Sequence, residues 1–138
     1  MLESSIQKEP AITSLFALVG RVLLAAVFIS AGWAKLMDPS MTAGWMASAG
    51  IPYSDMLIWA VIAVELLGGL MVLVGFKARW AALAIAGFLV PTNIIFHSDF
   101  ADQTQMMTFM KNAAIMGGML MLVAHGAGAY SFDKMMKR

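Results

Sequence analysis

The sequence predicts an all-α integral membrane protein. We expect a bundle of four spanning helices, with both termini inside and a short interfacial helix in the first outer loop. Apolar residues make up 61% of the 138 residues and charged residues only 12%, whereas soluble domains carry about 25% charged residues. A short chain exposes much surface relative to its volume, so a soluble protein of this size would need more charge. The net charge of +1 argues against a basic nucleic-acid binder, and no nucleic-acid partner is expected.

Four stretches are long and apolar enough to cross a bilayer, which takes about 20 residues. They are residues 12–36, 55–76, 80–97 and 109–129. We take residues 12–133 as one membrane domain, between a tail over 1–11 and a basic tail over 134–138. The links are short, so consecutive helices are expected to be antiparallel. Residues 41–49 are predicted to form the interfacial helix, anchored by Trp45 and stopped by Gly50 and Pro52.

The distribution of Lys and Arg predicts the orientation, because cytoplasmic loops are enriched in these residues. With the N-terminus inside, Lys35 and Lys111 are the basic residues on the outer side. The cytoplasmic side would then hold Lys8, Lys77, Arg79, Lys134, Lys137 and Arg138. Both termini are therefore predicted to be cytoplasmic.

The absence of cysteine limits the chemistry that the chain can perform by itself. With no cysteine, disulfides, thiolate metal sites and CxxC redox motifs are excluded. A single histidine near the outer side and acids scattered over different helices give no metal-ligand spacing. No metal site is expected, and any redox role would depend on a bound cofactor or a partner.

Arg21 and Glu65 are charged residues inside predicted spans, where an ionisable group costs at least about 2.5–3.5 kcal/mol and usually finds a partner. Arg21 lies about 21 Å of helix rise from Lys35, and Glu65 lies about 15 Å from Asp55. If the outer ends of the two helices are level, Arg21 is about 6 Å deeper than Glu65, an offset that an arginine side chain can span. We therefore predict an Arg21–Glu65 ion pair, either structural or part of a site.

Other polar residues gather toward the outer ends of the four helices. Asn93 and His97 are four residues apart and share a helix face, and they follow Pro91, which promotes irregular backbone of the kind that lines cavities. These positions predict a polar pocket that opens outward and reaches Glu65. Its candidate residues are Arg21, Lys35, Glu65, Asn93, His97, Lys111 and Asn112.

The order of several motifs resembles that of DoxX-like inner-membrane proteins of proteobacteria. After Arg21 the motifs are SAGWAKL at 30–36, ELLGG at 65–69, GFKAR at 75–79, FHS at 96–98 and FMKN at 109–112. The resemblance covers about residues 15–133. It implies a four-helix protein of the bacterial inner membrane, and the family's polar positions correspond to Arg21, Lys35, Glu65, His97, Lys111 and Asn112.

The resemblance also suggests functions. Some relatives are small subunits of a thiosulfate:quinone oxidoreductase, and others are implicated in oxidative-stress defence with protein partners. The chain has no G-x-G-x-x-G fingerprint after a strand, so we do not expect a complete enzyme. The favoured hypothesis is an accessory subunit that binds quinone or quinol and passes electrons to a redox partner protein. The alternatives are a small-molecule or ion transporter that acts as a homo-oligomer, and a scaffold with a purely structural ion pair.

Overall fold

The structure of the protein is a computed structural model that describes residues 10–136. Within this range the chain is helical and has no strand, so the predicted all-α class is confirmed. The helices are α1 (Ala11–Met37), α2 (Pro39–Ser48), α3 (Ser54–Val74), α4 (Ala78–Phe96), α5 (Gln103–His125) and α6 (Phe132–Met136). Most of the predicted tail over 1–11, and the last two residues of the tail over 134–138, lie outside the described residues.

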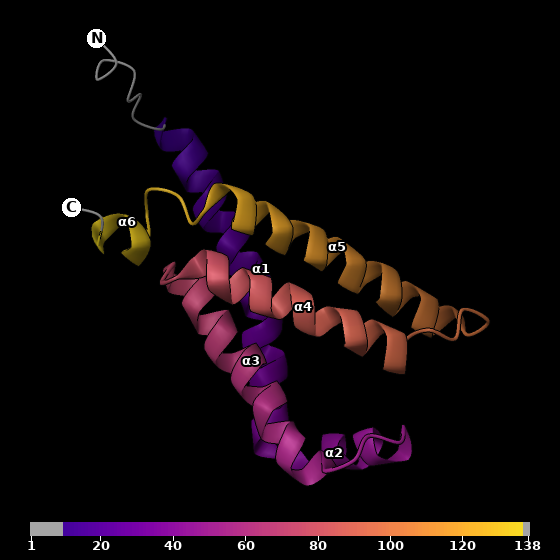
Figure 1. Ribbon diagram of the computed structural model, residues 1–138. Helices are drawn as coiled ribbons and strands as arrows, with labels where there is room; N and C mark the ends of the chain where they lie inside the picture. The colour runs from indigo at the N-terminus through magenta and orange to yellow at the C-terminus, as the bar shows by residue number, and fades with distance from the viewer. Residues whose placement is uncertain (1–9, 137–138) are drawn as a thin grey trace.

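The four long helices form two antiparallel pairs that diverge from one end of the molecule. α1 packs mainly against α3, and α4 packs mainly against α5. The pairs meet where α3 turns into α4, and they separate toward the opposite ends of α3 and α4 (Figure 1). α6 and the start of α1 lie at the closed end, which we call the terminal end. α2 lies beside the start of α3 at the opposite end, which we call the α2 end. The bundle is therefore a wedge that opens toward the α2 end.

The main core lies where the pairs meet. Small and medium side chains fill it, including Ala25, Val72, Ala82, Ile85 and Met119, none of which is measurably exposed. A second, smaller cluster joins α2 to α3 and contains Ala43, Met46, Ile58 and Ile62. Phe96 of α4 packs against this cluster, but its buried members lie on α2 and α3, so within residues 10–136 no buried cluster joins the two helix pairs at the α2 end.

The α1–α3 contact depends on glycines that leave no room for a side chain. A Cβ atom on Gly32 would lie 2.9 Å from the backbone nitrogen of Leu66, and a Cβ on Gly69 would lie 2.9 Å from Cγ1 of Ile29. Small residues allow this close backbone approach between membrane helices. Gly32 is thus level with Leu66, which fixes the register of the two helices.

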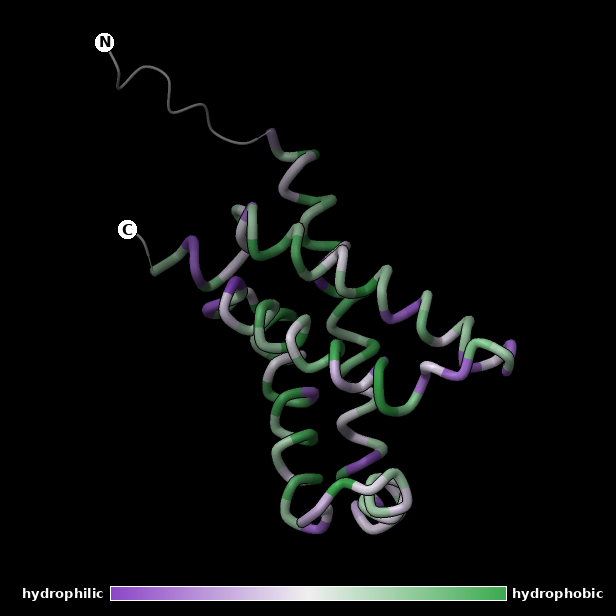
Figure 2. Tube along the Cα trace, turned by 45° about the vertical axis from the view of Figure 1, so that its right-hand side comes forward, coloured by the Kyte–Doolittle hydropathy of each residue, from purple (hydrophilic) through white to green (hydrophobic). Residues whose placement is uncertain are grey.

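Each long helix is apolar enough to span a membrane, and most of its surface faces outward. Between 17% and 33% of each spanning window is buried. Large apolar side chains are exposed along these helices, among them Phe16, Leu23, Leu67 and Leu120. Hydrophobic residues follow the long helices and hydrophilic ones gather mainly at the ends and links (Figure 2). This distribution fits helices that face lipid.

Local capping explains where two of the helices begin. Asp38 accepts a hydrogen bond from the backbone nitrogen of Met41 at 3.4 Å, and Pro39 occupies the first turn of α2; the predicted short helix in this loop is confirmed. Asp102 accepts from the backbone nitrogen of Thr104 at 3.0 Å, so α5 begins in the polar segment before Phe109, earlier than its hydrophobic stretch indicates. Gly126, with φ +78°, ends it.

The close approach predicts a difference between two glycines on the same helix. We expect Gly32→Ala to lower the free energy of unfolding by roughly 2 kcal/mol, because the added methyl group overpacks the α1–α3 contact. Gly20→Ala is the matched control, since a Cβ there meets nothing within 4 Å. It should be neutral or slightly stabilising because alanine favours helix. Thermal unfolding of both variants in detergent micelles tests this, and equal effects would contradict the register.

Candidate functional site

The opening of the wedge contains a cavity of about 650 Å³ that we call the wedge pocket. Its walls come from α1, α2, α3 and α4, and most of its lining is apolar. Aromatic and proline side chains such as Trp45, Phe88, Pro91 and Phe96 form much of this surface. A cavity of this size, largely apolar with few polar groups, has the properties of a small-molecule site.

An ion pair between Lys35 and Glu65 lies in the wall of the wedge pocket. Lys35 Nζ is 3.0 Å from Oε1 and 2.9 Å from Oε2 of Glu65, so the ammonium donates to both carboxylate oxygens. The Glu65 side chain is 7% exposed and that of Lys35 is 24% exposed. The pair therefore neutralises two charges at membrane depth while the ammonium remains partly accessible from the pocket.

The predicted Arg21–Glu65 ion pair is wrong, and the reason is the helix register. The prediction assumed level outer ends for the first two spans. Gly32 is level with Leu66. From that level toward the α2 end, α1 continues for five residues to Met37, whereas α3 continues for twelve residues to Ser54, so the ends of the two helices are not level. Side chains on a helix lean toward its N-terminus, so those of Lys35 and Glu65 lean toward each other across the antiparallel pair.

Arg21 lies about 16 Å of helix rise from Gly32, toward the terminal end. Its guanidinium donates to the backbone oxygens of Val72 at 3.2 Å, Leu73 at 3.0 Å and Tyr130. The first two are carbonyls of the last turn of α3, which have no partner within the helix and carry the negative end of its dipole. Arg21, 2% exposed, thus caps α3 and holds the C-terminal segment. It is not part of the wedge pocket.

Asn93 and Asn112 join α4 to α5. The side-chain nitrogen of Asn112 donates to Oδ1 of Asn93 at 2.9 Å, and the side-chain nitrogen of Asn93 donates to the backbone oxygen of Phe109 at 3.3 Å. Both side chains are buried, so the two amides satisfy each other between the helices. Lys111 is exposed on α5. None of these three residues lines the wedge pocket.

His97 is the third sequence-predicted residue that the wedge pocket contains. It caps the end of α4 and donates its backbone N–H to the oxygen of Asn93 at 3.0 Å. Burial lowers the pKa of its imidazole, and the positive charge of Lys111 lowers it further. The ring is therefore neutral at pH 7, with one nitrogen that donates and one that accepts a hydrogen bond.

Sequence reasoning did not find the contribution of α2 to the site. This helix supplies Met41, Thr42, Trp45 and Met46 to the wedge pocket. The sequence indicates an interfacial anchor at Trp45, and no local signal shows that the first loop packs against α3. Within residues 10–136, no group of three His, Asp or Glu side chains could hold a metal ion.

Comparison with known proteins supports the same class of protein. The DoxX family model matches residues 16–98. The chain is 41% identical to the inner membrane protein YqjF of Escherichia coli over 121 residues, 88% of this chain and 92% of that protein. It is 29% identical to the inner membrane protein YphA of the same organism over 123 residues, 85% of this chain and 87% of that protein. No solved structure matches the chain.

The position of Arg21 predicts that it stabilises the C-terminal segment and leaves the wedge pocket unaffected. We expect Arg21→Gln to lower the free energy of unfolding by about 3 kcal/mol or more, since three charge-assisted hydrogen bonds weaken. It should also expose the segment at Ser131, which is buried in the native protein. Because the chain has no cysteine, thiol labelling of Ser131→Cys reports this opening.

Glu65→Gln is the control for this experiment. It should leave labelling at position 131 unchanged, because Glu65 has no contact with the C-terminal segment among the described residues. Faster labelling in Glu65→Gln, with no effect of Arg21→Gln, would contradict the assigned partners.

Proposed function

The chain belongs to the DoxX family of integral inner-membrane proteins, and we propose that it binds the head group of a membrane quinone or quinol in the wedge pocket. In this proposal the protein is an accessory subunit of a redox complex. The observation that carries the proposal is an ion pair between the partly buried Lys35 and the buried Glu65 in the wall of a largely apolar cavity between lipid-facing helices.

The shape and lining of the cavity support an apolar, membrane-soluble ligand. A volume of about 650 Å³ is within the range of small-molecule sites. Trp45, Phe88 and Phe96 offer aromatic surface to a planar ring. The wedge lies between helices that face lipid, so a ligand dissolved in the bilayer could enter from the side and keep an apolar tail outside.

The polar side chains that line the wedge pocket support binding of a head group with hydrogen-bonding oxygens. The ammonium of Lys35 can donate a hydrogen bond to a carbonyl oxygen, and a carboxylate oxygen of Glu65 can accept one from a hydroxyl group. The neutral imidazole of His97, at the rim, can do either. These three side chains would therefore serve both the oxidised and the reduced form of a quinone, and Glu65 and His97 could exchange protons with its oxygens.

The electrons would come from elsewhere. Reduction of a quinone to a quinol takes two electrons and two protons, and side chains of this cysteine-free sequence can supply protons but have no electron carrier among them. We therefore propose a redox partner protein. The predicted orientation, with both termini cytoplasmic, would place the wedge pocket toward the outer leaflet.

Loss of the Glu65 charge should reduce quinone retention. We expect Glu65→Gln, purified in mild detergent from native membrane, to carry about tenfold less quinone per protein than wild type, because a hydrogen bond to a charged group is lost. Solvent extraction followed by chromatography measures the bound quinone. Asp55→Asn is the matched control, since Asp55 is an exposed acid on the same helix and does not line the pocket.

A charge swap separates a packing role from a ligand role. Lys35→Glu combined with Glu65→Lys keeps an ion pair between α1 and α3, so we expect it to recover the thermal stability of the single variants without recovering quinone. If Glu65→Gln and the swap both retained wild-type quinone, or if wild-type protein could not be loaded with quinone, the pair would be a packing element and the proposal would fail.

A further inference from the structure

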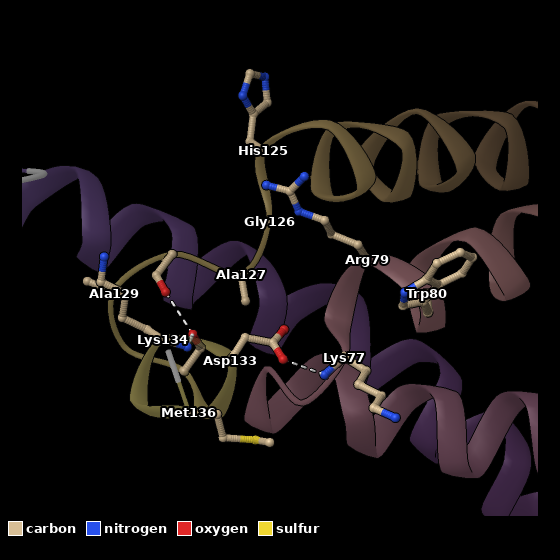
Figure 3. Close-up of a pocket in the computed structure, with 12 residues that line it drawn as sticks. Lys77, Arg79, Trp80, His125, Gly126, Ala127, Ala129, Asp133, Lys134 and Met136 are labelled. Carbon is tan, nitrogen blue, oxygen red and sulfur yellow. Dashed lines mark hydrogen bonds between the residues drawn. The ribbon is translucent and has the colours of Figure 1, made fainter. Parts of the chain in front are cut away.

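A second cavity lies at the terminal end, far from the wedge pocket. Its volume is about 500 Å³, and it forms where α4 begins, α5 ends and the C-terminal segment folds back. We call it the basic pocket because its charged lining consists of Lys77, Arg79, Lys134 and one acid, Asp133, with His125 at the end of α5 (Figure 3). The proposed function makes no use of this cavity.

The acid in the basic pocket, Asp133, binds backbone N–H groups at the start of α4. The carboxylate of Asp133 accepts hydrogen bonds from the backbone nitrogens of Lys77 at 2.7 Å and Ala78 at 2.9 Å. These are N–H groups at the start of α4, which an acid satisfies well. Asp133 faces the backbone of Lys77, whereas the ammonium of Lys77 points away from it (Figure 3). Among the described residues, Asp133 forms no salt bridge with Lys77, Arg79 or Lys134. With these three cations and one acid, the lining carries a net positive charge.

The guanidinium of Arg79 lies next to the loop that follows α5. It is beside Gly126, where a Cβ would be 3.0 Å from both Nε and Nη2 (Figure 3). Within residues 10–136 no hydrogen bond or salt bridge satisfies this guanidinium. The backbone N–H groups of Ala127, Gly128 and Ala129, in the adjoining loop, likewise have no acceptor in the described part of the chain.

We propose that the basic pocket binds the phosphate of an anionic phospholipid. A guanidinium donates to phosphate oxygens in a fork geometry, and free backbone N–H groups in a glycine-containing loop are typical donors to anions. The ligand class is therefore a phosphate with net negative charge. A zwitterionic lipid is less suitable, since its own ammonium group would enter a pocket that is already positive.

The position of the pocket selects a lipid as the source of that phosphate. It lies where the spanning helix α4 begins and the spanning helix α5 ends, which is the depth of the head groups in a bilayer. Trp80, 72% exposed in its wall, has the amphipathic ring that prefers this interface. Basic pockets between spanning helices are known binding sites for anionic head groups.

The test is lipid binding by delipidated protein in neutral detergent. We expect phosphatidylglycerol to raise the melting temperature in a saturable way, and intact-complex mass spectrometry to show bound lipid. Arg79→Gln should raise the half-saturating lipid fraction by about tenfold, since hydrogen bonds to a charged group are lost. Lys111→Gln, which removes one exposed cation from the other end of α5, should match wild type.

Three results would overturn the proposal. Equal stabilisation by phosphatidylcholine would show that net charge does not matter. Equal stabilisation by millimolar inorganic phosphate would identify a site for soluble anions in place of a lipid site. Binding of phosphatidylglycerol by Arg79→Gln with wild-type affinity would show that the lipid binds elsewhere. Quinone retention at the wedge pocket should be unchanged in Arg79→Gln, so this test is independent of the proposed function.

Discussion

The contact of Gly32 with the backbone of Leu66 determines the arrangement of the remaining structure. Because a Cβ at Gly32 would lie 2.9 Å from that backbone nitrogen, α1 and α3 can approach this closely in one register. That register brings Lys35 to Glu65 and carries Arg21 to the carbonyl end of α3. Between helices that face lipid, where apolar packing surfaces are interchangeable with lipid tails, such small-residue contacts and buried polar groups specify position.

The two ends of the molecule differ because their connections differ. At the terminal end, Arg21 binds carbonyls of α3 and of the C-terminal segment, and Asp133 caps α4. These bonds hold both helix pairs together around the main core. At the α2 end, no hydrogen bond or salt bridge between described side chains joins the two pairs, and the pairs diverge there (Figure 1). The wedge pocket lies in this opening, and the Lys35–Glu65 pair lies in its largely apolar wall.

The class, the spans and the short helix were predictable because hydropathy and capping are local properties of the sequence. The partners of Arg21 were not, because they are backbone oxygens far along the chain, and a carbonyl leaves no trace in the sequence. The partner of Glu65 could be predicted only with knowledge of the register of α1 against α3. That register depends on where Gly32 contacts α3. Asn93 and Asn112 lie on the helices that the sequence predicts. Only the packed structure shows that their amides are hydrogen-bonded to each other and do not line the wedge pocket.

The central claim is that Glu65 is coupled to Lys35 and independent of Arg21. Two double-mutant cycles on thermal unfolding test it directly, one with Lys35→Met and Glu65→Gln, the other with Arg21→Met and Glu65→Gln. Contacting charged residues typically show coupling of about 0.5–3 kcal/mol, and independent sites add to within about 0.5 kcal/mol. The structure predicts coupling in the first cycle and additivity in the second. Additivity in the first cycle with coupling in the second would contradict the register.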